Sequence, residues 1–478
     1  MSYTTFSPLL TDLYQLTMAY GYWRLNMHEQ EASFHLLFRK NPFKGNYALS
    51  CGLATVVDFL SHWRFQEDDL AYLATLKNAD HSPLFSPEFL SYLKKLDFSC
   101  DIDAISEGTV VFPHTPLLRI QGPLLQCQLL ESPLLNLMNF QTLVATKASR
   151  VCRAAGQDTV IEFGMRRAQG PDGALSASRA AYIGGCVATS NALAGKLFDI
   201  PVRGTHAHSW VSAFPNETAA FSAYASVMPH NCTLLVDTYN TIQGVKNAIE
   251  VGRKLREEGA DLLGIRLDSG DMASLSIRAR ALLDEAGFNN TLILASNSLD
   301  EYVITDLKEK GAAISSWGVG TNLATAYDQP ALDGVYKLSA LRSIDGKWEY
   351  KIKLSEQEIK ISNPGRHQVR RFFIGEQYAM DMIYDLDLGI AEIPEGKLLD
   401  GDASKTKRLD DYDAFVDLLQ PVFRRGKLVK ENESIHTIRH TAIAEVALFH
   451  QAHDNAAYPV CLERNLYELK HQLMKKLK

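Results

Sequence analysis

Between about residues 157 and 340 the sequence alternates short runs rich in β-branched residues with longer amphipathic stretches. This repeat constrains the fold most, because its spacing predicts parallel strands joined by crossover helices. The predicted strands are DTVIEF, IPVRG, TLLVDT, LLGIRLDS, TLILAS and AISSWGVG, and helical patterns lie between them at 178–198, 240–258 and 299–310. No G-x-G-x-x-G follows the first strand, so an irregular β/α barrel is favoured over an open dinucleotide-binding sheet.

The segments on either side of this repeat have a different pattern. Helices are predicted at 12–26, 52–62 and 86–95, and strands at ASFHLLFR, GTVVFP, LLRIQG and around KWEYKIKL and HQVRRFF. We therefore expect an α/β protein in three parts. These are an N-terminal α+β domain (1–150), the barrel (151–345), and a last part (346–478) whose strands complete the N-terminal domain before a mostly helical tail from about 405.

Composition narrows the class of protein. Hydrophobic residues make up 46% of the chain and charged residues 22%, which is typical of a soluble globular protein. The net charge of -7 argues against nucleic acid or an anionic membrane as a partner. The seven cysteines are scattered without a C-x-x-C, no stretch reaches the length of a membrane span, and the first residues lack the features of a signal peptide. We expect reduced thiols and a cytoplasmic location.

In a β/α barrel the chemistry takes place at the carboxyl ends of the strands. Polar or small residues follow nearly every predicted strand: Glu162 with Arg166 and Arg167, Thr205 to His208, Asp237 and Thr238, Arg266 with Asp268, Ser296 with Asn297, and Gly318 to Thr321. Several arginines at strand ends of an acidic protein indicate an anionic substrate, because a guanidinium matches carboxylate and phosphate oxygens.

The motif GTHAHSWV places His206 and His208 two residues apart. On an extended strand both would face the same way, as in metal-dependent barrel hydrolases, but later strand ends offer no further histidine. A structural reading, with one or both rings hydrogen-bonded at the barrel rim, stays open.

Two further motifs have both a functional and a structural interpretation. In SSWGVGTNLATA, Gly318 and Gly320 allow close backbone approach to a phosphate, although a plain turn is equally consistent. In GIRLDSGD, Asp268 and Asp271 are candidates for Mg²⁺ or ribose binding, or for capping the next helix. Tyr14, in DLYQLTMAYGY, lies on a pattern that is most often packed in a core.

Taken together, several motifs resemble the nicotinate phosphoribosyltransferase family. They are DLYQLTMAYGY, FHLLFRKNPF, EFGMRRAQGPDGALSASRAAYIGG, NALAGKLFDIPVRGTHAHSWV, VDTYNT, GIRLDSGD and GVGTNL, and they occur in family order. The stretch from RRAQGPDG to AHSWV is the most specific of them.

The resemblance implies a type II phosphoribosyltransferase fold with an active site at a homodimer interface. Its reaction joins nicotinate to 5-phosphoribosyl 1-pyrophosphate and gives nicotinate mononucleotide and pyrophosphate, a salvage step of NAD biosynthesis. ATP drives the reaction through a phosphorylated histidine, and Mg²⁺ neutralises the pyrophosphate. An imidazole suits this role because it is nucleophilic near neutral pH.

The resemblance also implies roles for individual residues. His208 is the phosphorylated histidine, and His206 falls at a variable position. The expected nicotinate-binding residues are Tyr14 from the neighbouring subunit, Phe163, Thr205 and Arg266. The expected donor-binding residues are Arg166, Asp268, Gly318, Gly320 and Thr321, and the expected Mg²⁺ ligands are Asp268 and Asp271.

Other functions are kept as alternatives. Nicotinamide-preferring relatives carry an aspartate where this chain has Ser190, and quinolinate enzymes share the architecture without a phosphohistidine. A barrel metal hydrolase using His206 and His208, and a barrel that only binds a ligand, belong to different classes.

Overall fold

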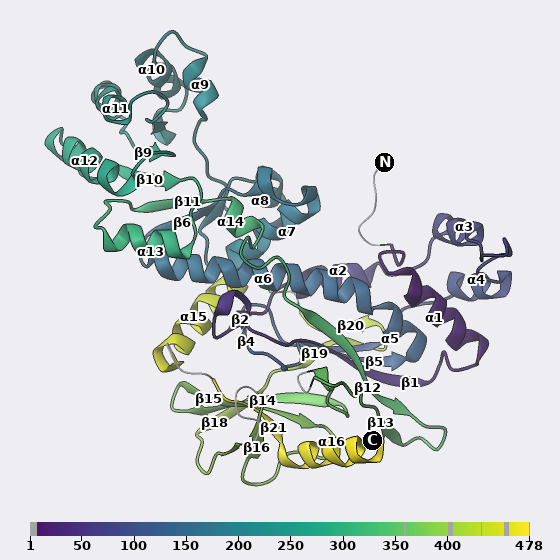
Figure 1. Cartoon of the computed structure of the whole chain (residues 1–478). Helices are drawn as coiled ribbons and strands as arrows, with labels where there is room; N and C mark the ends of the chain where they lie inside the picture. Colours follow the sequence, from purple (N-terminus) through teal and green to yellow (C-terminus); the bar gives the residue numbers. More distant parts are fainter. Residues whose placement is uncertain (1–6, 358–359, 400–404, 432, 454–457, 478) are drawn as a thin grey trace. The chain divides into compact units, whose positions relative to one another are not determined.

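The computed structural model describes residues 7–357, 360–399, 405–431, 433–453 and 458–477 (Figure 1). The chain divides into two compact units. Unit 1 comprises Met1–Leu143, Ala331–Ser434 and Ala444–Lys478, and unit 2 comprises Val144–Pro330 and Ile435–Ile443. The divisions after Leu143 and Pro330 lie somewhat before the expected ones at 150 and 345.

Unit 2 is built on a six-stranded parallel sheet with the strand order β7-β6-β11-β10-β9-β8. Its strands are β6 (Thr159–Glu162), β7 (Ala188–Thr189), β8 (Thr233–Leu235), β9 (Gly264–Leu267), β10 (Leu292–Ser296) and β11 (Ser316–Val319). The parallel α/β architecture expected from the repeat is confirmed. Among the described residues no ladder of hydrogen bonds joins β7 to β8, so closure into a barrel stays a prediction.

One predicted strand of unit 2 did not form. The segment IPVRG makes only an isolated bridge between Val202 and Thr189, while the two-residue β7 lies inside the stretch 178–198 that was predicted as helix. Pro201 lacks a backbone N–H to donate to a neighbouring strand, which shortens any ladder at this edge of the sheet.

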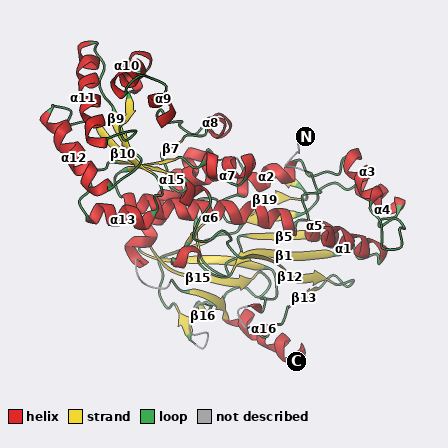
Figure 2. Ribbon diagram, turned by 45° about the horizontal axis from the view of Figure 1, so that its top comes forward, coloured by secondary structure: helices red, strands yellow, loops and turns green. Residues whose placement is uncertain are grey.

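The helices of unit 2 surround its strands (Figure 2). They are the last part of α6 (Glu131–Ala155), a 3-10 turn (Met165–Arg167), α7 (Gly170–Ile183), α8 (Ala192–Phe198), α9 (His208–Ser212), α10 (Glu217–Val227), a 3-10 turn (Pro229–Asn231), α11 (Thr241–Glu257), α12 (Met272–Glu285), α13 (Glu301–Glu309) and α14 (Thr321–Ala324). Helix α11 shows why they form: the Asn240 side chain accepts from the Gln243 N–H at its start, and Val245, Ala248 and Ile249 recur on its buried face.

Unit 1 holds a seven-stranded sheet with the order β13-β12-β1-β5-β3-β19-β20. The strands are β1 (Glu31–Phe38), β3 (Asp101–Ala104), β5 (Leu118–Pro123), β12 (Gly334–Arg342), β13 (Trp348–Tyr350), β19 (Gln420–Arg424) and β20 (Lys427–Leu428). Strand β1 pairs antiparallel with both β5 and β12, so segments about 300 residues apart share one sheet.

A second sheet of unit 1 has six strands in the order β17-β16-β21-β15-β14-β18. They are β14 (His367–Ile374), β15 (Gln377–Asp385), β16 (Glu395–Leu398), β17 (Thr406–Arg408), β18 (Ala414–Asp417) and β21 (Val460–Glu463), and a separate pair joins β2 (Ala48–Leu49) to β4 (Val110–Val111). The remaining elements of unit 1 are α1 (Leu13–Arg24), a 3-10 turn (Pro42–Lys44), α2 (Leu53–Ser61), α3 (Glu67–Thr75), α4 (Pro87–Lys94), α5 (Leu124–Leu129), the first part of α6, α16 (Arg464–Leu477) and the last part of α15 (Ile435–His453), whose first part belongs to unit 2.

The prediction of a mostly helical tail after residue 405 is wrong in part. Strands β17 to β21 lie in this segment, and within its described residues α15 and α16 are the helical elements. All three residues of β17 are exposed, as are three of the four in β18, so these strands lack the alternating apolar pattern that reveals a strand in a sequence.

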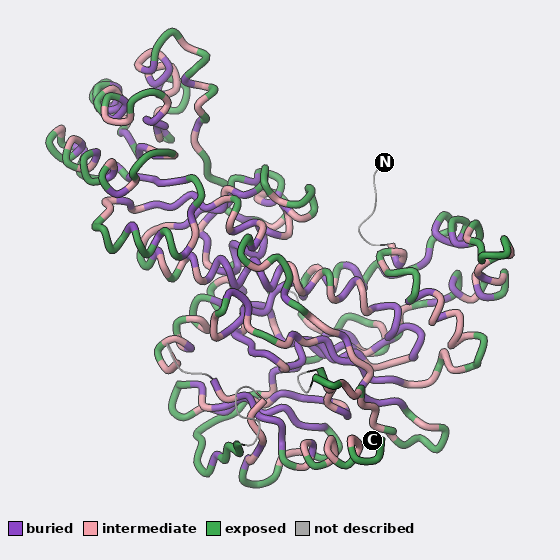
Figure 3. The backbone as a smooth tube through the Cα atoms, in the orientation of Figure 1, coloured by how far each residue is buried: buried purple, intermediate pink, exposed green. Residues whose placement is uncertain are grey.

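The strands of both units are largely buried (Figure 3). In unit 2, Trp317 of β11 is completely buried, and its indole N–H donates to Asp158 at 3.1 Å. None of the helices in the described ranges is both long enough and apolar enough to pass through a bilayer.

Two buried imidazoles of unit 1 stack on each other. The rings of His35 and His367 lie 4.1 Å apart between centroids. His35 Nε2 accepts a hydrogen bond from the backbone N–H of His367 at 3.0 Å, so that nitrogen cannot carry a proton. Burial lowers the pKa of His35 well below its usual range and that of His367 to about 4.

We expect the stability of unit 1 to fall on acidification for this reason. Between pH 6.5 and about 4 the unfolded chain takes up a proton at His367 that the folded chain does not. The contribution of neutral His367 to the free energy of unfolding is therefore fully present above pH 6.5. It is lost as the pH falls towards 4 and amounts to about 3 kcal/mol. Thermal unfolding midpoints at pH 7.0, 6.0 and 5.0 measure the effect. The drop should be smaller in His367→Gln and unchanged in the exposed control His62→Gln; equal drops in all three proteins would contradict it.

Candidate active site

The candidate site lies at one edge of the unit 2 sheet. The six strands run parallel, so their carboxyl ends meet at the same edge. The polar residues predicted at strand ends therefore come together there. Thr205, Arg266, Asp268 and Ser296 are joined directly by hydrogen bonds.

Arg266, on β9, is the centre of this network. Its Nε donates to Ser296 Oγ at 2.8 Å, its Nη1 to Thr205 Oγ1 at 3.2 Å, and its Nη2 to Asp268 Oδ1 at 2.9 Å. Ser296 also donates to Asp268. Three of the five guanidinium N–H groups are thus used, and one on each terminal nitrogen remains for a ligand. The arrangement holds a cation at fixed position and orientation, as anion recognition requires.

These contacts lower the pKa of the Asp268 carboxyl. Burial by itself would raise the pKa of its carboxyl, but the hydrogen bond from Ser296 and the charge of Arg266 outweigh burial and hold that pKa below its usual value. Asp268 is therefore ionised at neutral pH.

The aromatic ring of Phe163 lies beside Arg266. The Arg266 guanidinium carbon lies 5.7 Å from the ring centroid of Phe163, which follows β6. Gly318 on β11 leaves room for this ring, because a Cβ there would come within 2.5 Å of two Phe163 ring carbons. Gly320 approaches the backbone of the same residue, where a Cβ would lie 3.1 Å from the carbonyl oxygen. The absence of side chains at Gly318 and Gly320 thus allows Phe163 to lie where it does.

A buried carboxylate fixes the backbone that carries Phe163. Glu162 accepts hydrogen bonds from Ser178 Oγ at 2.9 Å, from Thr189 Oγ1 at 2.6 Å, and from the backbone N–H of Gly164. Its side chain has donors on both oxygens, so its burial is compensated and the segment after β6 is held in one conformation.

His208 is the first residue of α9, and its side chain is 45% exposed. Its Nδ1 lies 3.2 Å from Thr238 Oγ1. Its Nε2 faces two carboxylates, at 3.7 Å from Asp268 Oδ2 and 4.0 Å from Asp237 Oδ1. An accessible imidazole with a hydroxyl within hydrogen-bond distance of one nitrogen and carboxylates near the other is suited to nucleophilic attack or proton transfer.

Asp237 is a member of the site to which the sequence analysis assigned no role. It is fully buried at the side chain, and its Oδ2 accepts from the Asp268 N–H at 3.0 Å and from Ser269 Oγ at 2.6 Å. Its Oδ1, which faces His208, has no hydrogen-bond partner among the described residues. The sequence signal was a carboxylate directly after a buried strand, in VDT.

His206 has a structural role. It is buried, its Nε2 accepts the backbone N–H of Leu235 at 3.2 Å, and its ring lies 4.8 Å from that of Tyr224. Burial lowers its pKa. The expectation that His206 and His208 face the same way is wrong, because helix α9 begins at His208 and ends the extended geometry. The described residues also contain no cluster of three or more metal-binding side chains, so the hydrolase alternative has no support.

The other predicted residues are placed as follows. Arg166 is exposed in the 3-10 turn after β6. Thr321 begins the short helix α14 after Gly320. Asp271 accepts from the Ser274 N–H at the start of α12, which is the capping geometry. Tyr14 belongs to unit 1, where it is 51% exposed on α1 rather than packed in a core.

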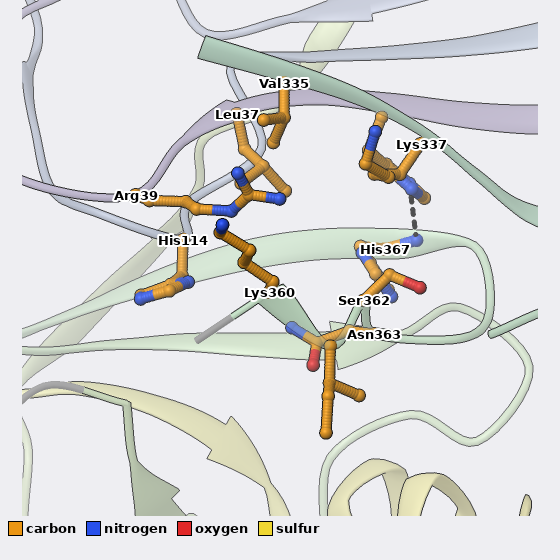
Figure 4. Close-up of a pocket in the computed structure, with 11 residues that line it drawn as sticks. Leu37, Arg39, His114, Val335, Lys337, Lys360, Ser362, Asn363 and His367 are labelled. Carbon is orange, nitrogen blue, oxygen red and sulfur yellow. Dashed lines mark hydrogen bonds between the residues drawn. The ribbon is translucent and has the colours of Figure 1, made fainter. Parts of the chain in front are cut away.

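Unit 1 carries a separate cationic pocket (Figure 4). Arg39, Lys337 and Lys360 line it together with His114 and the His35–His367 pair, and none of the lining residues within the described ranges is acidic. Burial lowers the pKa of His114 to about 4, so the positive charge comes from the arginine and the lysines. The Nδ1 atoms of both stacked histidines are buried without a hydrogen-bond partner in the described part of the chain. Sequence reasoning missed this pocket, because its residues come from four distant segments.

A parallel α/β sheet with arginine, aspartate and an accessible histidine at its carboxyl edge defines an enzyme that acts on small anions. Comparison with protein families identifies which one. Residues 9–139 match the model of the nicotinate phosphoribosyltransferase N-terminal domain, 159–366 that of the nicotinate phosphoribosyltransferase family, and 366–470 that of its C-terminal domain.

Individual relatives agree with the family models. A nicotinate phosphoribosyltransferase of Bacillus subtilis is 40% identical over 98% of this chain and 96% of its own length. The crystal structure of the human nicotinic acid phosphoribosyltransferase superposes with a TM-score of 0.85 at 31% identity, covering 97% of this chain and 99% of that one. A nicotinate-nucleotide pyrophosphorylase from Pyrococcus furiosus, at TM-score 0.68 and 20% identity, shares the fold.

The chain therefore belongs to the nicotinate phosphoribosyltransferase family and is an enzyme of NAD biosynthesis. The family resemblance read from the motifs is confirmed. The hydrolase and the ligand-binding barrel are excluded by the same comparisons.

Proposed function

We propose that the enzyme joins nicotinate to 5-phosphoribosyl 1-pyrophosphate, and that ATP drives this step through a phosphohistidine at His208. One observation carries the proposal: Asp268 connects the anion-binding arginine to the accessible imidazole. Its Oδ1 accepts from Arg266 at 2.9 Å, and its Oδ2 lies 3.7 Å from His208 Nε2. A carboxylate-binding group and a phosphoryl acceptor thus share one small site.

Nicotinate is a flat aromatic ring with a carboxylate, and the site offers a partner for each part. The remaining N–H groups of Arg266 and the hydroxyl of Thr205 suit the carboxylate. The ring of Phe163 suits one face of the pyridine. In the proposed homodimer, Tyr14 of the neighbouring subunit covers the other face of the pyridine. Tyr14 is exposed on α1 and is therefore accessible for this contact.

The carbon–nitrogen bond forms when the pyridine nitrogen attacks the sugar carbon and pyrophosphate leaves. Because charge separates in this step, neutralising the pyrophosphate is the main task of the protein. Arg166 and the backbone around Gly318, Gly320 and Thr321 are the proposed contacts to the donor.

The proposed Mg²⁺ fits the residues at this edge of the sheet. Asp268 is ionised, and the buried Oδ1 of Asp237 beside it lacks a hydrogen-bond partner among the described atoms. Asp268, with Asp271 at the start of α12, would hold the ion. Bound there, Mg²⁺ would offset the charge of the pyrophosphate.

The geometry around His208 favours Nδ1 as the phosphorylated atom. The carboxylates of Asp237 and Asp268 stabilise a proton on Nε2, so the lone pair is left on Nδ1. Nδ1 attacks the γ-phosphorus of ATP, the bond to the β-phosphate oxygen breaks, and ADP leaves. The carboxylates then offset the positive charge that develops on the ring. Water later cleaves the phosphorus–nitrogen bond and releases phosphate.

The cationic pocket of unit 1 offers a place for an anion that is separate from the proposed donor and phosphoryl-acceptor residues of unit 2. We also place the enzyme in the cytoplasm, for which its seven free cysteines offer support.

A single assay tests the proposed function. Purified protein is incubated with nicotinate, the phosphoribosyl donor, Mg²⁺ and ATP labelled at the γ-phosphate. We expect nicotinate mononucleotide, pyrophosphate, ADP and phosphate, and acid-labile label on the protein when nicotinate and the donor are omitted. Product formation that is unaffected by ATP, with no label on the protein, would overturn the ATP-coupled mechanism.

Gly318→Ala should weaken nicotinate binding without affecting the phosphoryl acceptor. The new Cβ would lie 2.5 Å from the Phe163 ring, so the ring must move, at a cost of about 1–3 kcal/mol. We expect the nicotinate KM to rise roughly tenfold while labelling of the protein by ATP continues. Gly173→Ala, where a Cβ meets nothing within 4 Å, is the matched control. An unchanged nicotinate KM in Gly318→Ala would show that Phe163 does not contact nicotinate.

A further inference from the structure

Among the described residues, Thr238 is the one whose side chain is within hydrogen-bond distance of the His208 imidazole. It follows β8, is half-buried, and its Oγ1 lies 3.2 Å from His208 Nδ1. The residue before it, Asp237, is fixed by hydrogen bonds from the Asp268 N–H and Ser269 Oγ. The hydroxyl is therefore held in place from outside helix α9, while His208 belongs to that helix.

The proton positions on the imidazole decide what this hydroxyl does. Two carboxylates face Nε2, so that nitrogen carries the proton and Nδ1 is an acceptor. Thr238 then donates its O–H to the lone pair of Nδ1. The hydroxyl adapts to the tautomer that the carboxylates set, and the contact orients the ring with Nδ1 as the nucleophile. At 3.2 Å the bond is long for an O–H donor, so it is weak and easily given up.

Phosphorylation of Nδ1 leaves the hydroxyl without its acceptor. The lone pair becomes the phosphorus–nitrogen bond, and three phosphoryl oxygens take positions around Nδ1 within reach of a donor 3.2 Å from that atom. A hydrogen bond to such a charged oxygen is stronger than the original bond to a neutral nitrogen. The same hydroxyl is thus suited to orient the free imidazole and then to hold the phosphoryl group.

We propose that Thr238 sets the lifetime of the phosphohistidine, so that the phosphoryl group is retained until nicotinate and the donor are bound. This inference rests on the proposed function, because it presupposes phosphorylation of His208. The chemical step is the competing hydrolysis: water attacks phosphorus, the phosphorus–nitrogen bond breaks, the nitrogen regains its lone pair and phosphate leaves. A hydrogen bond from Thr238 to the phosphoryl oxygens stabilises the phosphorylated state and slows this loss.

Thr238→Val removes the hydroxyl and keeps the branched shape. Labelled phosphoenzyme is prepared with ATP alone, and its decay is followed by rapid quenching. We expect the label to decay roughly tenfold faster than in the wild type, and the ratio of ATP hydrolysed to nicotinate mononucleotide formed to rise. The nicotinate KM should be unchanged, which a general disturbance of the site would not allow.

Two further variants complete the design. Thr238→Ser keeps the hydroxyl and should restore the lifetime. Thr305→Val should behave as the wild type, because the Thr305 hydroxyl donates to the carbonyl of Glu301 within its own helix α13. If Thr238→Val is insoluble, Thr238→Ala removes the same hydroxyl and is read in the same way. Little accumulated label with fast ATP hydrolysis supports the proposal, because it is the expected result of rapid decay.

The possible failures are distinguishable. Absence of His208-dependent label in the wild type would overturn the proposed function itself. Label in the wild type together with an equal decay rate in Thr238→Val would overturn only the role of Thr238. Loss of both label and ATP hydrolysis in Thr238→Val would also overturn it, because the hydroxyl would then be needed for attack rather than for retention.

Discussion

His208→Ala is expected to abolish the phosphoenzyme and to remove the dependence of the reaction on ATP. The imidazole is the accessible nucleophile at the carboxyl edge of the unit 2 sheet, and neither Asp237 nor Asp268 can form the same phosphoramidate. Label from γ-labelled ATP should fall to background. Nicotinate mononucleotide should still form, at a rate equal to that of the wild type assayed without ATP, because the nicotinate contacts of Arg266 and Thr205 remain.

The control for this variant is His230→Ala. His230 is exposed in the 3-10 turn before β8, outside the site, so labelling and ATP dependence should match the wild type. Acid lability with stability in base identifies the label as a phosphoramidate rather than a phosphoester. Persistent labelling of His208→Ala with this lability would assign the phosphoryl acceptor to another residue.

The parts of the fold that the sequence predicted are those with a clear periodic pattern. Strands β8 to β11 are short buried runs bounded by polar residues, and helix α11 has a regular apolar face. Strand β17 could not be predicted in this way, because its three residues are all exposed and its formation depends on pairing with β16. The sharing of one sheet by β1, β5 and β12 rests on contacts across about 300 residues, which no local pattern encodes.

The site was predicted partly from charged residue types at strand ends and partly from the family resemblance, which alone supplied the role of Thr205. Arg266, Asp268 and Thr205 were predicted as ligand-binding residues, and the structure joins them in one network. The two histidines differ in a way that local sequence does not reveal. On a strand they would be equivalent, but helix α9 starts at His208, so that His206 packs beneath the site while His208 faces outward. Asp237 was noted at a strand end, but its buried, unpaired oxygen is visible only once the fold brings it to His208.

Arg266→Ala is expected to raise the nicotinate KM by roughly two orders of magnitude while the donor KM changes little. The substitution removes the cation that the proposal assigns to the pyridine carboxylate, and a hydrogen bond between charged groups contributes about 1.5–3 kcal/mol. It also leaves Asp268 without its ion pair, so a moderate fall in the thermal unfolding midpoint should accompany the loss. Arg266→Lys keeps the positive charge but lacks the planar guanidinium with its paired N–H groups. Its nicotinate KM should lie between those of the wild type and Arg266→Ala.

Nicotinamide distinguishes a carboxylate contact from a general disturbance, because it has the same ring without the charge. If Arg266 binds the carboxylate, the preference for nicotinate over nicotinamide should shrink in Arg266→Ala and stay intact in Arg203→Ala, whose exposed side chain lies outside the network. If the donor KM rises instead and the nicotinate KM does not, Arg266 binds a phosphate of the donor. The carboxylate would then need another cation at the carboxyl edge of unit 2, and the exposed Arg166 after β6 would be the next residue to replace.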